Sequence, residues 1–239
     1  MSNSYFQFKQ FTIQQDQCAM KVCTDACLFG AWVAMHIENE ERIKSIADIG
    51  SGTGLLGLML AQKNNAAIDA VELNADVANQ AKQNFEASPW KDRLTVFNDD
   101  ILSFIPQKKY DFIISNPPFF EEDLKSSNSQ RNTAMHSTTL TLQQLLQQIK
   151  RLIQAEGSAA VLIPYKRCVY FEELLEAEGF FIKHAMLVKQ SAKHDFFRSQ
   201  YIFSLKQNKK NISRITIQDA ERKYSDEFTA LLKPYYYKL

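Results

Sequence analysis

The chain has 239 residues, of which 45% are hydrophobic and 23% charged, and its formal net charge is +1. These values are typical of ordinary soluble globular proteins, and the near-zero charge excludes a global field that would attract a polyanion. No apolar run approaches the roughly 20 residues of a membrane span, and the first ten residues contain no secretion signal. We therefore expect a cytoplasmic protein that forms a single domain over residues 1–239 and has no membrane partner.

The cysteines are too few and too unevenly spaced for a disulfide scaffold; they are Cys18, Cys23, Cys27 and Cys168. The first three do not have zinc-site spacing and no histidine lies near them, so we expect no metal. The sequence does not indicate an oligomeric state, and a monomer is the default.

About residues 1–40 form an N-terminal segment that is expected to cover the cofactor. Residues 6–27 of it are polar and punctuated by aromatics, and a helical run follows at 28–35. Thr24 or Asp25 is a plausible N-cap for that helix. The alternative is that the loop before the helix covers a ligand.

From residue 45 onward, strand-like runs alternate with helical ones. The strands are expected at 45–49, 68–73, 94–97, 111–115, 159–163, 182–189 and 200–205. The helices are expected at 55–63, 75–87, 140–155 and 171–178, with Gly157 and Gly179 at helix C-termini. This alternation predicts an α/β fold with a mostly parallel sheet covered by helices on both faces.

The last two predicted strands have no helix between them, so we expect antiparallel neighbours at one edge of the sheet. Basic residues gather there: Lys183 to Arg214 contains eight of them and one acid, Asp195. Residues 206–239 follow as a C-terminal extension whose arrangement the pattern does not predict.

A glycine-rich loop follows the first strand of this alternation. Four of the seven glycines fall between Asp48 and Gly57, and Gly50, Gly52 and Gly54 precede a predicted helix. Glycine lets backbone approach a ligand closely, and a helix N-terminus supplies N–H groups. Glu72 ends the second strand 22 residues after Gly50, where an acid grips a ribose diol in doubly wound sheets. The pattern predicts a nucleoside-type cofactor.

Two features favour S-adenosylmethionine over a nicotinamide dinucleotide. Asp48 would lie badly beside a pyrophosphate but well beside a cationic amino-acid group. The third strand ends before Asp100 and Ile101, where a carboxylate can accept from an adenine amine and a backbone N–H can meet a ring nitrogen.

The fourth strand runs directly into Asn116-Pro117-Pro118-Phe119. Two prolines end the strand and remove two backbone donors. The turn therefore offers carbonyl oxygens, a primary amide and an aromatic ring, which suit a planar, amine-bearing group.

Taken in order, these motifs resemble the class I S-adenosylmethionine-dependent methyltransferases with an N-P-P-[YF] signature. Further segments resemble the bacterial tRNA1(Val) adenine-37 N6-methyltransferase family; they are Lys9-Gln-Phe11, Gln15-Asp16, Met20-Lys-Val-x-Thr-Asp25, Gly30-Ala-Trp32, 58–62 and Ser88-Pro-Trp90. The resemblance covers about residues 6 to 165. It implies a Rossmann-like sheet of seven strands with an antiparallel edge strand, and transfer of one methyl group to an anticodon-loop adenine of a tRNA.

The sequence departs from the family pattern at three places. Cys23 stands where a glycine is usual, Met135-His136 replaces an Arg-His pair, and Phe119 replaces the commoner Tyr. Phe at that position also occurs in guanine-N2 methyltransferases.

The proposed roles follow from these motifs. Asn116 and the Pro117 carbonyl would accept the two hydrogens of the target amine, with Pro118 fixing the turn and Phe119 stacking on the base. The residues expected at the cofactor are Lys21, Thr24, Asp48, Gly50, Gly52, Gly54, Glu72, Asp100, Ile101 and Asn116. The candidates for RNA phosphates are Arg131, Lys166, Arg167, Lys193 and Arg198. His136 is expected to contact phosphate or to serve the structure.

Other readings stay open at this point. The same turn fits a methyltransferase for guanine N2, DNA adenine or a protein glutamine. An NAD-linked oxidoreductase would leave Asn116 to Phe119 without a role, and an intact cofactor loop argues against a non-catalytic RNA-binding module.

Overall fold

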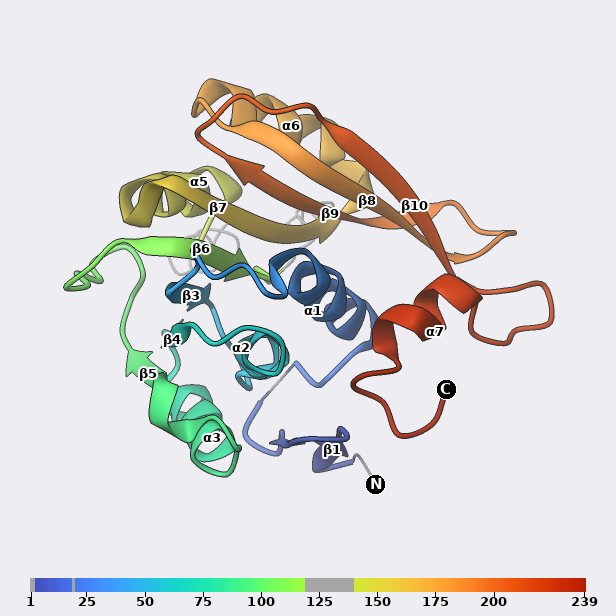
Figure 1. Ribbon diagram of the computed structural model, residues 1–239, viewed down its shortest axis with the longest axis horizontal. Coiled ribbons are helices and arrows are strands. Elements are labelled where there is room, and N and C mark those ends of the chain that lie inside the picture. Colours follow the sequence, from blue (N-terminus) through green and yellow to red (C-terminus); the bar gives the residue numbers. More distant parts are fainter. Residues whose placement is uncertain (1–2, 19, 119–139) are drawn as a thin grey trace, which may run out of the picture.

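The computed structural model describes residues 3–18, 20–118 and 140–239. Its centre is an eight-stranded sheet in the order β10-β8-β9-β7-β6-β3-β4-β5 (Figure 1). The strands are β3 (Ser45–Ile49), β4 (Ala67–Glu72), β5 (Leu94–Asn98), β6 (Tyr110–Ser115), β7 (Ile153–Pro164), β8 (Phe181–Ser191), β9 (Phe196–Ser204) and β10 (Asn211–Gln218). Strands β3 to β7 pair in parallel, β9 is antiparallel to both β7 and β8, and β10 is parallel to β8.

Helices cover both faces of this sheet, as the alternating pattern predicts. They are α1 (Thr24–Ile37), α2 (Leu55–Ala61), α3 (Ala75–Glu86), α5 (Leu142–Leu152), α6 (Cys168–Ala177) and α7 (Asp226–Leu232), with 3-10 turns η1 (Lys91–Arg93) and η2 (Tyr165–Arg167). Successive strand residues point to opposite faces, so Ile46 packs with α1, α2 and α7, whereas Ala47 packs with α5 and α6.

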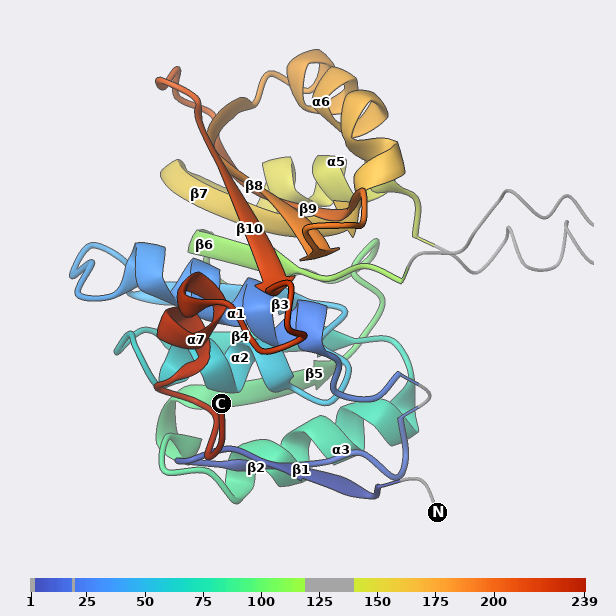
Figure 2. The same cartoon turned by 90° about the vertical axis from the view of Figure 1, so that its right-hand side faces the viewer.

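The N-terminal segment is attached to α3. A short hairpin of β1 (Tyr5–Gln7) and β2 (Thr12–Gln14) lies along that helix (Figure 2). The buried Asn84 amide accepts from the Gln14 N–H at 2.8 Å and donates to the carbonyls of Gln14 and Thr53, both at 2.9 Å. One helical side chain therefore links the hairpin to the glycine loop.

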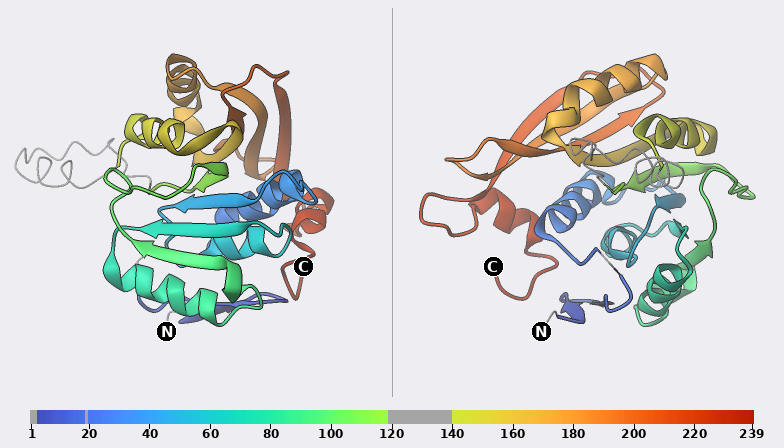
Figure 3. Two further views of the ribbon diagram at one scale, coloured as in Figure 1. Left: turned by 60° about the vertical axis from the view of Figure 1, so that its left-hand side comes forward. Right: turned by 180° about the vertical axis from the view of Figure 1, so that it is seen from behind.

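The C-terminal extension is part of the same body. Its residues 234–236 lie beside the N-terminal hairpin and α2 (Figure 3), where the Tyr235 hydroxyl donates to the Met59 carbonyl at 3.1 Å and the Tyr235 carbonyl accepts from the Lys9 N–H at 2.8 Å. The extension also supplies β10, so the sheet has eight strands rather than the expected seven. The antiparallel pair is present as expected, but β9 is an inner strand, because it bonds to β7 on one side and β8 on the other.

Two local expectations are wrong. Gly157 does not end a helix: it lies within β7, where an added Cβ would sit 2.7 Å from the Ile153 side chain. Neither Thr24 nor Asp25 caps α1, whose N-cap is Cys23 without a side-chain cap bond. Gly179, in contrast, follows α6 with φ 77° and is the left-handed residue expected there. No helix among the described residues is long and apolar enough to cross a membrane.

Candidate active site

The parallel strands bring the predicted motifs to one edge of the sheet. Ile49, which precedes the glycine loop, pairs with Val71 on one side and with Ser115 on the other. Glu72 pairs with Asn98 one strand further out. The glycine loop, Glu72, the turn after β5 and Asn116 therefore all follow the carboxyl ends of adjacent strands, where ligands bind in open α/β sheets.

The glycines of the loop divide into two kinds. Gly50 and Gly52 have φ values of 67° and 56°, and a Cβ added to either would meet nothing within 4 Å. Gly54 has φ 80°, but its Cβ would lie 2.6 Å from the ring of Phe85. The first two thus leave backbone open to a ligand, whereas Gly54 serves close packing between the loop and α3.

Glu72 holds this loop in place. Its carboxylate accepts from the N–H of Gly52 and from the N–H of Asn74, each at 3.0 Å. The side chain is only half-buried, and each oxygen has a second lone pair free for a further donor. A ribose hydroxyl is such a donor.

Asp48 is fully buried beneath the loop. Its Oδ2 accepts from the Gly57 N–H at 3.1 Å, while its Oδ1 has no partner among the described residues. Burial raises the pKa of this carboxyl to about 7, the Gly57 bond opposes the rise, and the nearby Glu72 adds to it. A buried acceptor without a donor is costly, and a cationic ligand group would relieve that cost.

The end of β6 carries a second unpartnered acceptor. The Asn116 Oδ1 is buried and has no hydrogen-bond partner among residues 3–18, 20–118 and 140–239, and the same is true of the Ser51 hydroxyl in the glycine loop. The Ser115 hydroxyl donates to the Ile49 carbonyl at 2.9 Å and so joins the end of β6 to the start of the loop. Pro117 is buried and Pro118 exposed. Phe119 lies outside the described residues.

The turn after β5 is built around Asp100. Its carboxylate accepts from the Leu102 N–H at 2.9 Å, and its carbonyl accepts from the N–H groups of Ser103 and Phe104. Ile101 is 7% exposed and packs into the core beside this turn. The predicted pair is thus present as a fixed turn at the same edge.

Lys21 and Thr24 lie in the segment before α1. The Lys21 ammonium donates to the Asn3 carbonyl at 3.2 Å, and Thr24 is the first residue of α1. The assignment of both residues to the cofactor stays a prediction. Asn84, Ser51 and Ser115 were missed by the sequence analysis. Of these, only Asn84 carries a sequence signal, a polar pair with Gln80 at helical spacing.

Comparisons with known proteins decide the family. The model of the methyltransferase small domain matches residues 30–178. The tRNA1(Val) (adenine(37)-N6)-methyltransferase of Cytophaga hutchinsonii is 40% identical, and the match covers 100% of both chains. The protein of the same name from Dyadobacter fermentans is 49% identical over 72% of this chain and 70% of its own. The chain belongs to the tRNA1(Val) (adenine(37)-N6)-methyltransferase family.

Solved structures agree on the fold. A predicted O-methyltransferase from Agrobacterium tumefaciens has a TM-score of 0.67 at 15% identity, covering 88% of this chain and 96% of its own. A ribosomal protein L11 methylase from Lactobacillus delbrueckii subsp. bulgaricus has a TM-score of 0.57 at 15% identity, covering 82% of this chain and 84% of its own. At these identities the likeness concerns the fold, which is the Rossmann-like fold of methyltransferases.

In this family member, the described candidates for RNA contact also lie at the carboxyl edge of the sheet. Lys166 and Arg167 follow β7 in η2, and Lys193 is exposed in the turn between β8 and β9. Arg198 pairs across the sheet with Pro164, and its Nε donates to the Asp25 Oδ2 at 2.7 Å. Arg198 therefore also joins β9 to the first turn of α1. Arg131 and His136 lie outside the described residues.

Proposed function

We propose that this protein transfers a methyl group from S-adenosylmethionine to N6 of an adenine in the anticodon loop of a tRNA, adenine 37 of tRNA1(Val) in the relatives' name. Support comes from family membership and from the chemistry at the carboxyl edge of the sheet. The observation that carries the proposal is the buried Asn116 Oδ1, which has no partner within the described residues, beside an open glycine loop.

The residues around the glycine loop fit S-adenosylmethionine. When bound, this cofactor supplies an electrophilic methyl group on a positively charged sulfur. Asp48 offers a buried acceptor without a donor, which suits the cationic amino-acid end, and Glu72 offers lone pairs to ribose hydroxyls. Asp100 and the Ile101 N–H are assigned to the adenine ring of the cofactor, and Lys21 and Thr24 to the segment that covers it.

Asn116 and Pro117 act on the target amine. An adenine amino group is a poor nucleophile because its lone pair is delocalised into the ring. The Asn116 Oδ1 and the Pro117 carbonyl accept hydrogen bonds from its two N–H groups, which favours tetrahedral geometry at nitrogen and aims the lone pair at the methyl group. As the new N–C bond forms, the S–C bond to the methyl group breaks, and the methylated nitrogen loses one proton to water. Phe119 is assigned to stacking on the base, which contributes about 1–3 kcal/mol and offsets part of the cost of turning the base out of its loop.

Replacing Asn116 tests this assignment. Asn116→Ala removes one acceptor from the target amine, so kcat should fall on the order of 10²-fold or more, while the affinity for S-adenosylhomocysteine stays within about twofold. Ser115→Ala is the matched control, because it truncates the neighbouring buried polar side chain, whose bond among the described residues is to the Ile49 carbonyl. Equal rates for the wild-type and Asn116→Ala proteins would refute the assignment.

A further inference from the structure

A groove of about 450 Å³ lies at the outer end of the sheet, lined by residues of β8, β9, β10 and the first turn of α7. Lys189 of β8 pairs with Thr216 of β10 on one side and with Phe196 of β9 on the other. Strands β8 and β10 run in the same direction as β7, because each is related to it through the antiparallel β9. The groove is therefore at the carboxyl edge, the edge that carries Asn116.

The walls of this groove combine positive charge with an aromatic ring. The Lys189 ammonium lies 4.7 Å from the centre of the Phe196 ring. Arg214, two residues before Thr216, is exposed on β10. Within the described parts of the chain, neither Lys189 nor Arg214 forms an ion pair. Both charges are therefore available to an anion.

The groove also has the donors and acceptors that a sugar needs. The Thr216 hydroxyl and the Glu227 carboxylate also line the groove, and the apolar Ile215 and the small side chain of Ala192 complete the lining. Single-stranded RNA is recognised by cations on its phosphates, rings on its bases and polar groups on its 2′-hydroxyls. With a net charge of only +1, attraction of a polyanion has to come from a local surface of this kind.

We propose that this groove binds one unpaired nucleotide of the tRNA substrate, other than the methylated one. Its phosphate contacts Lys189 and Arg214, its base packs against Phe196 and Ala192, and its ribose hydroxyl donates to Glu227. Three to four strand spacings of about 4.8 Å separate the groove from β6, so the bound nucleotide flanks the target by several positions. The inference rests on the proposed function, because it requires RNA as the substrate.

Two substitutions separate a nucleotide site from general electrostatic attraction. Arg214→Glu reverses one charge in the groove. Ala192→Phe fills the groove and leaves every charge in place; Ala192 is exposed in the β8–β9 turn, so it tolerates a larger side chain. Lys209→Glu is the matched control, because Lys209 is an exposed cation just before β10, at the opposite edge of the sheet.

The readouts are fluorescence anisotropy with a tRNA anticodon stem-loop, KM for tRNA, and S-adenosylhomocysteine affinity. Arg214→Glu and Ala192→Phe should each weaken RNA binding at least about fivefold and raise KM by a similar factor, with cofactor affinity and melting temperature unchanged. Lys209→Glu should stay within twofold. Normal binding by Ala192→Phe, or equal effects of Arg214→Glu and Lys209→Glu, would overturn the groove assignment while the wild-type protein still methylates tRNA. A wild-type protein that methylates no tRNA would overturn the proposed function itself.

Discussion

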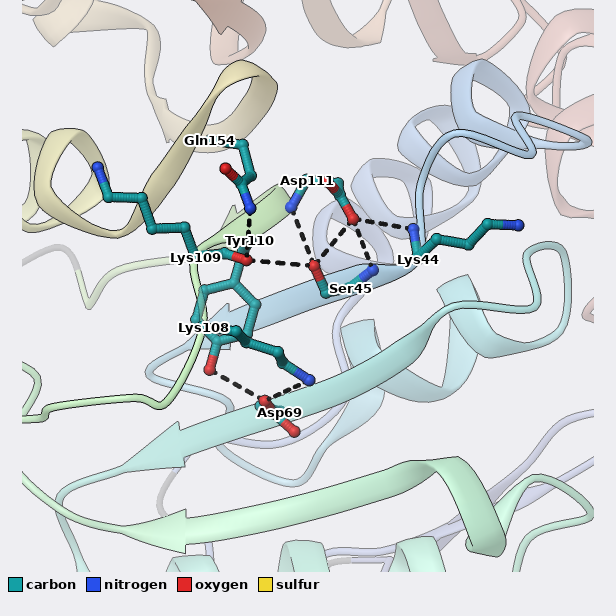
Figure 4. A network of polar contacts seen from close by, with 8 residues as sticks. All are labelled: Lys44, Ser45, Asp69, Lys108, Lys109, Tyr110, Asp111 and Gln154. Carbon is teal, nitrogen blue, oxygen red and sulfur yellow. Dashed lines mark hydrogen bonds and ion pairs between the residues drawn. The ribbon is translucent and has the colours of Figure 1, made fainter.

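The polar side chains at the two edges of the sheet differ in whether they have hydrogen-bond partners. At the amino edge, Asp111 accepts from the N–H of Lys44 at 2.9 Å and from the N–H and hydroxyl of Ser45 at 3.0 and 2.9 Å (Figure 4). Nearby, Asp69 accepts from the Tyr110 hydroxyl and pairs with Lys108. At the carboxyl edge, the buried Asp48 Oδ1, Ser51 hydroxyl and Asn116 Oδ1 have no partner in the part of the chain that the structure describes.

The amino edge also has a cavity of about 270 Å³, lined in part by Asp111, His36 and His184. Burial lowers the pKa of His36 to about 4, so this imidazole is neutral at pH 7. A cavity therefore does not by itself mark the reacting site. Buried polar atoms without a partner among the described residues do not mark it alone either, because Gln62, Ser199 and Gln200 also carry such atoms. The candidate site is marked where such atoms lie beside the open glycine loop, because a ligand bound there can supply the missing bonds.

The largest expected effect on stability comes from removing a hydrogen-bond acceptor at the amino edge of the sheet. Asp111→Ala would leave three donors without their acceptor and should lower the free energy of unfolding by about 2–3 kcal/mol. For a chain of this length that corresponds to a fall in melting temperature of roughly 5–10 °C. The affinity for S-adenosylhomocysteine, measured by titration calorimetry below the melting range, should not change. A tenfold loss of that affinity would place Asp111 in the cofactor site.

The next prediction concerns Gly52 and distinguishes the loss of space for the ligand from the cost of a left-handed backbone. Gly52→Ala should weaken S-adenosylhomocysteine binding at least about tenfold, because its Cβ enters the space left open for the ligand. Gly179→Ala is the matched control: its φ is 77° and an added Cβ there also meets nothing within 4 Å. Both variants should lose about 1–2 kcal/mol of stability from the left-handed backbone. Equal cofactor affinities in the two variants would contradict the assignment of Gly52.

A smaller effect follows from the raised pKa of Asp48. Burial raises the pKa of the Asp48 carboxyl in the folded state to about 7, from an ordinary value of 3.8. Between pH 3.8 and pH 7 the folded state therefore still holds a proton that the unfolded state has lost. The contribution of Asp48 to stability is fully present below pH 3.8 and is lost as the pH rises through 7. A cationic ligand favours ionised Asp48, so cofactor affinity should rise with pH across 6 to 8. Asp48→Asn should flatten this pH dependence of cofactor affinity. An unchanged pH profile in the variant would mean that another group causes the dependence.

The smallest effect is expected at Lys193, an exposed residue that is proposed to contact phosphate. Lys193→Ala should raise KM for tRNA only two- to threefold and reduce the slope of log affinity against log salt by about 1.

Arg198 differs from Lys193 because it bonds to Asp25. Arg198→Ala should therefore also raise KM for S-adenosylmethionine, by disturbing the first turn of α1. Identical kinetic profiles for the two variants would argue against this second role of Arg198.

Much of the fold could be predicted because it rests on local patterns. The strands at 45–49 and 111–115 have apolar centres, Ile46-Ala47 and Phe112-Ile113-Ile114, and the loop between Asp48 and Gly57 has glycines at fixed spacing. Strand β10 was not predicted, because its first four residues are exposed and only Ile215 and Ile217 point into the core. Gly157 was misassigned because a glycine after a helical run also fits a C-cap. Glycine is needed at position 157 because an added Cβ would lie too close to the Ile153 side chain and the Asp111 carbonyl, and this closeness is visible only in three dimensions.

In the candidate site, too, some features follow from local sequence and others depend on the three-dimensional arrangement. The cofactor loop and Asn116 stand next to strand ends, so their convergence follows from the parallel topology. The pairing of Arg198 with Asp25, 173 residues apart, depends on β9 lying inside the sheet. The groove beside Phe196 depends on β10. Neither could be read from spacing along the chain.

The most direct test of the proposed function is methyl transfer from labelled S-adenosylmethionine to unmodified bulk tRNA, followed by mass spectrometry of the nucleosides. The proposed function predicts N6-methyladenosine as the labelled product. N2-methylguanosine would keep the fold and the cofactor and change the substrate base. Label on DNA or protein, with none on tRNA, would contradict the central claim.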